Sequence, residues 1–248
     1  MSNTTYAFTL TILAGLSTMI GTIILFFKTK NKNNIIVSSL AFAAGVMLCL
    51  SLIELIPEGY RLINKKYNIF ASILVTLIFI NIGVIISSMI AKITPDKNNN
   101  KLYKVGIISM IAIIIHNLPE GIATFLATNN DRNIGLSLAI AIALHNIPEG
   151  ISISVPIYYA SKSKSKAFFY TFISALSEPL GAFLAFIFLK PFVTNTVMGM
   201  LFSFIAGIMM HISCKELLIE AVSYNKKGRV VVFFLIGVLF MVINEFIF

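Results

Sequence analysis

The sequence predicts an all-α polytopic membrane protein whose single transmembrane domain covers residues 1–248, and three observations support this prediction. Hydrophobic residues fill 58% of the 248 positions, and the mean hydropathy is +0.92. Apolar runs of helix length repeat along the whole chain, and a helix needs about 20 such residues to cross a bilayer. The polar gaps between the runs are short, so they leave no room for a separate soluble domain.

Eight apolar runs are long enough to be membrane-spanning helices. They lie at about residues 6–27, 35–56, 69–91, 104–127, 133–158, 166–189, 196–219 and 230–247. The fifth run is long for one span, so we expect it to be tilted or to extend beyond the bilayer. The first residues carry no basic segment and no small-residue cleavage site, and we therefore expect no removable signal peptide.

The basic residues predict how the spans are oriented. Fourteen of the 19 Lys and Arg lie in or beside the gaps after spans one, three, five and seven, and five lie in the other gaps. Because cytoplasmic loops carry the excess of basic residues, we expect a multi-pass protein of the cell membrane with both termini outside. The net charge of +9 is then a topological signal. The lipid bilayer is the expected surrounding of the protein, and no nucleic-acid partner is expected.

The ionisable groups inside the spans differ in kind from those in the gaps. All three His and several Glu fall within the predicted spans: His116, His145, His211, Glu54, Glu120, Glu149 and Glu178. A charged side chain at the bilayer centre costs about 2.5–3.5 kcal/mol even on the most lenient insertion scale. An interior that keeps carboxylates and excludes Lys and Arg is typical of a protein that holds cations.

Spans two and seven resemble each other. The segments 41–59 and 203–221 are identical at eight of nineteen positions when aligned with an offset of 162 residues, and two of the identities are Glu. The two spans are predicted to run in opposite directions across the membrane. Repeats of opposite orientation are typical of secondary transporters, so this pattern favours a transporter.

Spans four and five carry the most informative pattern, the near copies HNLPEG (116–121) and HNIPEG (145–150). A His and a Glu four residues apart lie on one face of a helix, because 3.6 residues make one turn. The spacing therefore places His116 with Glu120, and His145 with Glu149, on one face each. Both motifs lie about 20 Å from the loop that joins the two spans, at 1.5 Å per residue. Imidazole and carboxylate groups at one depth suit a divalent cation such as Zn²⁺ or Fe²⁺.

A plainer interpretation is that Asn-Pro and Pro-Gly mark turns in a soluble helical protein. Two copies within apolar helices disfavour it. Around the two motifs, Asn117 and Asn146 are either metal ligands or hydrogen-bond partners between helices. Glu178, a mid-membrane acid in span six, is a site residue by default. Met47 offers a soft thioether at a suitable depth, although a lone Met more often serves packing.

Four further polar residues lie nearer the two membrane surfaces. Glu54 and Glu58, toward the outer end of span two, are candidates to gather cations. His211 and Glu216, toward the cytoplasmic end of span seven, either form a relay on the exit side or cap the helix at the interface. The sequence leaves both alternatives open.

At this point the chain resembles the ZIP (Zrt-, Irt-like) family of divalent metal transporters, in particular its compact bacterial zinc-uptake branch. The resemblance rests on HNLPEG, HNIPEG, SEPLGA (177–182) and AAGVML (43–48), and with the eight spans it covers the whole chain. It implies a three-two-three arrangement, in which helices one to three and six to eight form inverted repeats around helices four and five.

The resemblance also implies a centre for two metal ions. The first site would consist of Met47, His116, Glu120, His145 and Glu149. The second would consist of Asn117, Asn146, Glu149 and Glu178, with Glu120 also able to bridge. Some members of the family carry an acid where this chain has Asn146, and an amide binds a metal less strongly than a carboxylate.

The resulting hypothesis is uptake of Zn²⁺ into the cytosol by alternating access, with Fe²⁺, Cd²⁺ and Mn²⁺ as further substrates. The ion is cargo, and no resident cofactor and no enzymatic activity are expected. The rival hypothesis is an intramembrane zinc-dependent hydrolase. It is disfavoured because the motif is not HExxH and the ligand sets leave no obvious open position. A homodimer is compatible with the sequence, which does not determine the oligomeric state.

Overall fold

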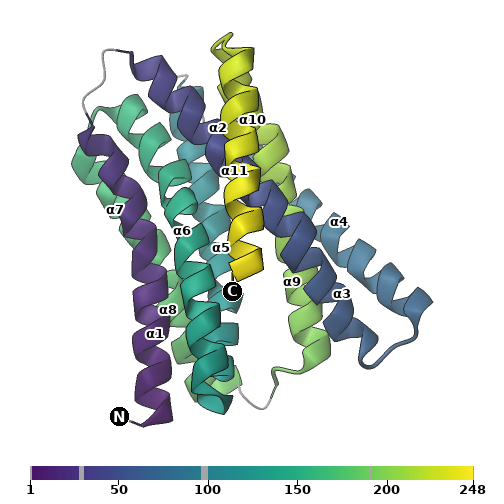
Figure 1. Ribbon diagram of the computed structural model, residues 1–248. Coiled ribbons are helices and arrows are strands. Elements are labelled where there is room, and N and C mark those ends of the chain that lie inside the picture. The colour runs from purple at the N-terminus through teal and green to yellow at the C-terminus, as the bar shows by residue number, and fades with distance from the viewer. Residues whose placement is uncertain (1, 28–30, 96–99, 190–191, 248) are drawn as a thin grey trace.

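The computed structural model describes residues 2–27, 31–95, 100–189 and 192–247 (Figure 1). Within these ranges all regular structure is helical, and eight helical segments are long and apolar enough to cross a membrane. The fold class and the eight predicted spans are thereby confirmed. Four spans consist of a single α-helix, and each of the other four contains one 3₁₀ or π segment.

The spans have the following bounds. Span one is α1 (Asn3–Ser17) with η1 (Thr18–Phe26), span two is α2 (Lys32–Leu50) with η2 (Ser51–Leu55) and α3 (Ile56–Asn64), span three is α4 (Ile69–Ile93), and span four is α5 (Lys101–Asn130). Span five is α6 (Arg132–Ser161), span six is α7 (Lys164–Ala175) with α8 (Ser177–Leu184) and η4 (Ala185–Leu189), span seven is α9 (Asn195–His211) with η5 (Ile212–Leu217) and α10 (Leu218–Ser223), and span eight is α11 (Lys227–Ile247).

Span two is longer than the sequence predicts, because the helix continues past residue 56 to Asn64. Pro57 and Glu58 ended the apolar run in the sequence. In the structure Pro57 lies in the first turn of α3, directly after the π-helical segment η2. Proline has no backbone N–H to donate, and directly before it the N–H of Ile56 donates to the Ser51 carbonyl, five residues back, as in a π-helix.

A tight turn joins α5 to α6 and fixes the relative depth of the two repeated motifs. The Asp131 side chain caps α6 by accepting hydrogen bonds from the backbone N–H of Asn133 at 2.8 Å and Ile134 at 3.2 Å. Both helices run unbroken through Pro119 and Pro148. The motifs therefore lie at similar distances from this turn. The N-terminus lies at the same end of the bundle (Figure 1), where the Arg132 guanidinium donates to Asn3 at 2.9 Å.

The inverted repeat is visible as matched local structure. The π segments η2 and η5 interrupt spans two and seven at corresponding places. At the start of these segments, Ser51 Oγ donates to the Met47 carbonyl and Ser213 Oγ donates to the Met209 carbonyl, each at 2.8 Å and with the same offset of 162 residues. The repeat extends beyond the spans in which the sequence revealed it. Ser17 Oγ donates to Ala14 and Ser177 Oγ to Ser174, both at 2.6 Å, at an offset of 160 residues.

Glycines mark where helices approach one another backbone to backbone. In 13 of the 14 glycines an added Cβ would meet another span, and the partners divide into two groups. Glycines of spans one, four, five and six meet only spans of that group, and those of spans two, three, seven and eight meet only spans of the second group. For example, Gly45 would meet the Phe234 carbonyl at 2.2 Å, and its counterpart Gly207 would meet that of Ile80 at 2.0 Å.

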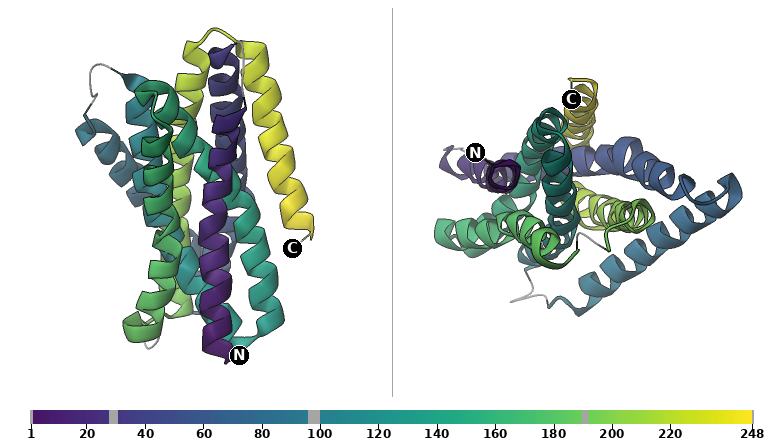
Figure 2. Two further views of the ribbon diagram at one scale, coloured as in Figure 1. Left: turned by 90° about the vertical axis from the view of Figure 1, so that its left-hand side faces the viewer. Right: turned by 90° about the horizontal axis from the view of Figure 1, so that it is seen from below.

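The arrangement of the helices follows from these contacts. α6 lies centrally and packs against α1, η1, α2, α5 and α7. α4 and α11 lie at the periphery, as the view along the bundle shows (Figure 2). Only 17% of the apolar window in α4 and 22% of that in α11 is buried, against 67% in α5. The protein thus surrounds α5 with other helices and leaves α4 and α11 exposed to the surrounding lipid.

Candidate metal site

Two histidines and two glutamates from α5 and α6 meet in the middle of the bundle. His116 Nε2 lies 3.2 Å from Glu120 Oε1 and 3.1 Å from Glu149 Oε1. His145 Nε2 lies 3.2 Å from the same Glu120 Oε1. Glu120 Oε1 is therefore shared by both imidazoles. The motif-bearing faces of the two helices are therefore turned toward one another. His116 contacts the Glu of its own motif and that of the other motif, and His145 contacts the Glu of the other motif.

The separations of these atoms fit ligands of one cation better than they fit hydrogen bonds. The Nε2 atoms of His116 and His145 and Oε1 of Glu149 satisfy no hydrogen-bond geometry in the structure, although they lie close to one another. Zinc binds nitrogen and oxygen at about 2.1 Å, so two ligands at 90° to 109° are about 3.0–3.4 Å apart. The observed 3.1–3.2 Å lies within this range.

The burial of the site adds a charge argument. His116 and His145 are at most 1% exposed, and Glu120 and Glu149 are at most 5% exposed. Among the described residues, none of the buried carboxylates forms an ion pair with Lys or Arg. Buried charges in proteins are paired or coordinate metals. A divalent cation would supply the missing positive charge. One ligand atom each from His116, Glu120 and His145 lie within 4.8 Å of one another.

Asn117 follows His116 and turns toward the other motif. With the amide oriented by its hydrogen-bond network, Asn117 Nδ2 donates to Glu149 Oε2 at 3.3 Å and to the Ile113 carbonyl at 3.0 Å. The amide oxygen is the atom that could bind a metal. In this state Asn117 therefore holds the Glu149 carboxylate in place.

Asn146 and Glu178 form a second polar group beside the first. Asn146 Nδ2 donates to Glu178 Oε2 at 2.9 Å and to the Ala14 carbonyl at 3.0 Å. Both side chains are fully buried, and Asn146 Oδ1 and Glu178 Oε1 have no hydrogen-bond partner among the described residues. Oxygen atoms left without donors in a buried site are suited to a cation. The group joins α6, α8 and α1.

Two glycines bring the neighbouring helices close enough to complete this centre. A Cβ on Gly121 would lie 1.9 Å from the Glu178 carbonyl oxygen, and a Cβ on Gly150 would lie 1.9 Å from the Thr18 carbonyl oxygen. Each glycine ends one of the two motifs. α5 thus packs directly on α8, and α6 packs directly on η1, in two equivalent contacts related by the repeat.

Helix one is the part of the site that sequence reasoning missed. Gly15–Thr22 (GLSTMIGT) aligns with Ala175–Ala182 (ALSEPLGA), and Thr18 stands where the second copy has Glu178. Thr18 Oγ1 donates within its own helix to the Gly15 carbonyl at 2.8 Å. The shared Leu-Ser and Gly of these segments were the available signal. As a consequence, the second polar group has a carboxylate from α8, Glu178, but none from the equivalent position of helix one.

The remaining candidates lie in different surroundings. Met47 is fully buried in α2, within the apolar cluster of the core, and α2 packs against α6. Glu54, in η2, lies near enough to interact electrostatically with His116, Glu120 and His145. Glu58 forms a bidentate ion pair with Arg61 at 2.6 and 2.7 Å, so its carboxylate is already neutralised at the surface.

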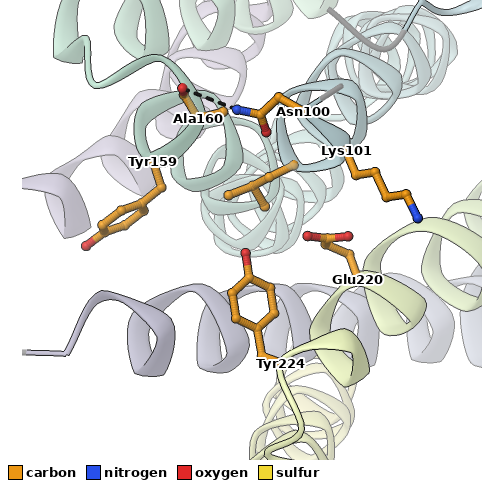
Figure 3. A pocket seen from close by; sticks show the side chains of 7 residues that line it. Asn100, Lys101, Tyr159, Ala160, Glu220 and Tyr224 are labelled. Carbon is orange, nitrogen blue, oxygen red and sulfur yellow. Dashed lines mark hydrogen bonds between the residues drawn. The ribbon is translucent and has the colours of Figure 1, made fainter. Parts of the chain in front are cut away.

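His211 and Glu216 line a cavity of about 360 Å³ at the end of the bundle opposite the N-terminus. His211 Nδ1 lies 2.9 Å from Ser87 Oγ of α4. A second cavity of about 430 Å³ lies beside it, and Figure 3 shows Glu220 and Tyr224 pointing into that cavity opposite Asn100. Burial and the Glu220 carboxylate raise the pKa of the Tyr224 hydroxyl to about 12. The hydroxyl is therefore a neutral donor at physiological pH.

Comparisons with known proteins agree with this picture. The family model described as "ZIP Zinc transporter" matches residues 92–245. The chain is similar to a zinc transporter ZupT of Streptococcus mutans, with 42% identity over 98% of this chain and 97% of that protein. It is also similar to a zinc transporter ZupT of Clostridium perfringens, with 37% identity over 100% of this chain and 98% of that protein. A third, from Lysinibacillus sphaericus, is 41% identical over 90% of each chain.

Proposed function

The chain belongs to the ZIP zinc transporter family, and from this membership and the geometry of the site we propose that it carries Zn²⁺, and also Fe²⁺, into the cytosol. Zinc is the substrate of this transporter and not the cofactor of an enzyme. The hydrolase hypothesis is accordingly not favoured. The entire chain matches its relatives, so the assignment covers all eight spans.

One observation supports the proposal above all others. Two imidazole nitrogens and two carboxylate oxygens, all buried, each lie 3.1–3.2 Å from at least one of the others, and no Lys or Arg of the described residues forms an ion pair with them. We assign the first metal position to His116, Glu120, His145, Glu149 and Met47. A second position takes Asn117, Asn146, Glu149 and Glu178. The unpartnered Asn146 Oδ1 and Glu178 Oε1 support the second position.

The path of the ion follows from the placement of the outer candidates. With both termini outside the cell membrane, Glu54 and Glu58 lie on the entry side, where the ion pair with Arg61 keeps the Glu58 carboxylate from taking part in the path, and His211 and Glu216 line the cavity on the exit side. In this scheme Glu54 draws the ion toward the His and Glu cluster, because it already interacts electrostatically with that cluster. Alternating access then exposes the cluster first to one side and then to the other.

We further propose that the protein forms a homodimer in the bilayer.

Uptake of radioactive ⁶⁵Zn²⁺ into proteoliposomes tests the proposal. We expect saturable uptake by the wild type and none by His116→Ala, because this variant loses the imidazole that contacts both Glu120 and Glu149. Wild-type protein that is folded and binds zinc, but transports none, would contradict the proposal and return attention to hydrolase activity.

Glu178→Ala separates the two metal positions. We expect its zinc affinity at the second position to fall by about 10-fold to 100-fold, while saturable uptake through the first position remains. Titration calorimetry should then show one zinc ion per protomer fewer than in the wild type. Loss of all uptake in Glu178→Ala would show that the two positions act as one.

Acidic solution is expected to slow uptake. The ligands bind the ion as neutral His and ionised Glu, so protons compete with the metal. Uptake should therefore fall steadily from about pH 7.5 to about pH 5.5, across the range in which an ordinary His takes up its proton. A flux into liposomes that rises over the same range would instead indicate coupling to protons.

A further inference from the structure

Four lysines gather around a cavity at the end of the bundle opposite the N-terminus. The cavity has a volume of about 360 Å³ and lies between α4, α5 and span seven. Its basic lining residues are Lys92, Lys101, Lys104 and Lys215, and we term it the lysine cavity. They come from the last turn of α4, the first turn of α5 and the π segment η5. Three spans thus bring positive charge to one place.

The acids beside these lysines do not balance their charge. Two carboxylates line the lysine cavity, those of Glu216 and Glu220. Glu220 also lines the neighbouring cavity and interacts electrostatically with Lys101. Among the described residues, Lys92 and Lys215 form no ion pair with a carboxylate. With histidine neutral, the described lining carries four positive and two negative charges, an excess that attracts anions.

The excess of basic residues in cytoplasmic loops does not explain Lys215. Lysines that set the topology of a membrane protein lie in loops or close to the ends of spans. Lys215 stands eight residues, or about 12 Å, before the end of span seven at Ser223. A lysine at such a depth is costly unless its ammonium group meets water or an anion. The lysine cavity is where the exposed Lys215 can meet either one.

The internal repeat has apolar residues at the equivalent positions of the other end of the bundle. Lys215 corresponds to Ile53 at the offset of 162 residues that relates spans two and seven. Gly83 and Gly237 both meet backbone carbonyls of the neighbouring repeat helix, which relates α4 to α11 at an offset of 154 residues. Position 92 is then equivalent to position 246, a phenylalanine. The basic lining is therefore not inherited from the repeat and belongs to this end alone.

The lysine cavity also borders the lipid. Ile219, which lines the cavity, is 57% exposed, and Ile93, next to Lys92 in α4, is 78% exposed. A ligand that combines a charged group with apolar chains can cover both kinds of surface, whereas a free anion would leave the isoleucines uncovered. Basic pockets between membrane-spanning helices are suited to the headgroups of anionic lipids.

We propose that the lysine cavity binds the phosphate headgroup of an anionic phospholipid. The phosphate lies among the ammonium groups, and the acyl chains run along the exposed surface beside Ile219. In the orientation proposed above, the lipid belongs to the cytoplasmic leaflet. Its negative charge then offsets the positive charge that faces a cation leaving past His211 and Glu216. This effect on release rests on the proposed function, whereas binding of the lipid does not, so the two can fail separately.

Lipid binding to the purified full-length protein tests the proposal. Native mass spectrometry in an uncharged detergent follows the first bound molecule of phosphatidylglycerol, with phosphatidylcholine and soluble glycerol phosphate for comparison. We expect phosphatidylglycerol to bind more tightly than either. Lys92→Gln combined with Lys215→Gln should weaken its binding by about 30-fold, because two basic contacts are lost. The matched control, Lys32→Gln with Lys166→Gln, removes two lysines that line neither cavity and should change binding by less than about 3-fold.

A tryptophan reporter locates the lipid without changing a lysine. The chain contains no tryptophan, so Ile219→Trp introduces a single one beside the lysine cavity. In liposomes, brominated phosphatidylglycerol should quench its fluorescence more strongly than brominated phosphatidylcholine at the same mole fraction. Phe172→Trp, at an exposed position of α7 that does not line the cavity, should be quenched equally by both lipids.

Four results would each overturn the proposal. They are equal binding of the two phospholipids, binding by the Lys92 and Lys215 double variant that matches the wild type, and equal quenching of Ile219→Trp by the two brominated lipids. The fourth is binding of glycerol phosphate as tight as that of phosphatidylglycerol, which would assign the lysine cavity to a free phosphate.

Discussion

Glu120→Gln is expected to reduce zinc uptake by at least about 100-fold, since even residues that only support a metal ligand cost 10-fold to 100-fold. Glu120 Oε1 is the one oxygen that lies 3.2 Å from both His116 and His145. Glutamine keeps the size of the side chain but removes the negative charge that the buried cation needs. The protein should therefore fold normally, bind zinc weakly and transport almost none.

The measurement is initial ⁶⁵Zn²⁺ uptake into proteoliposomes, with zinc binding by calorimetry on the same preparation. Glu58→Gln is the matched control, because Glu58 is paired with Arg61 at the surface. It should retain uptake close to that of the wild type. Uptake by Glu120→Gln at more than about a tenth of the wild-type rate would show that the shared oxygen is dispensable, contrary to the assignment above.

Gly121→Ala is expected to be among the most damaging single-methyl changes in the protein. The added Cβ would lie 1.9 Å from the Glu178 carbonyl oxygen, which belongs to the backbone of α8 and cannot turn aside. Overpacking of this kind costs about 1–3 kcal/mol. Since α8 must move away, Glu178 moves with it, and Asn146 loses its 2.9 Å partner. Stability and the second metal position should suffer together.

Thermal unfolding in detergent measures the effect, and each kcal/mol should lower Tm by about 2–4 °C in a chain of this size. Gly228→Ala is the control, because an added Cβ there meets nothing within 4 Å. Gly150→Ala, whose Cβ would meet the Thr18 carbonyl at 1.9 Å, should resemble Gly121→Ala. A Gly121→Ala protein as stable as Gly228→Ala would mean that α5 and α8 can separate freely.

Much of the fold was predictable because a membrane imposes simple rules on a sequence. Length and hydropathy mark the eight spans, and the i, i+4 spacing of His116 with Glu120 marks the buried faces of α5 and α6. Both features depend on short stretches of sequence. The sequence predicted equal depth for the two motifs, and in the structure His116 Nε2 lies 3.1 Å from Glu149 Oε1 and His145 Nε2 lies 3.2 Å from Glu120 Oε1.

Features that depend on tertiary packing could not be predicted in the same way. The π segment η2 carries span two past Pro57, although the local sequence reads as the end of a helix. The Ala14 carbonyl reaches Asn146 only because Gly150 allows η1 to lie against α6. A search of the sequence for polar side chains does not reveal which backbone carbonyls contribute to the site. The ligand role of Met47 stays a prediction.

The division of the glycine contacts has a mechanical consequence. Close backbone contacts hold spans one, four, five and six together and, separately, hold spans two, three, seven and eight together, but none joins the two groups. In the alternating access proposed above, the two groups would move relative to each other along the boundary between them, which includes the contact of α2 with α6. The His and Glu cluster belongs to the first group of spans, whereas Met47 and Glu54 belong to the second.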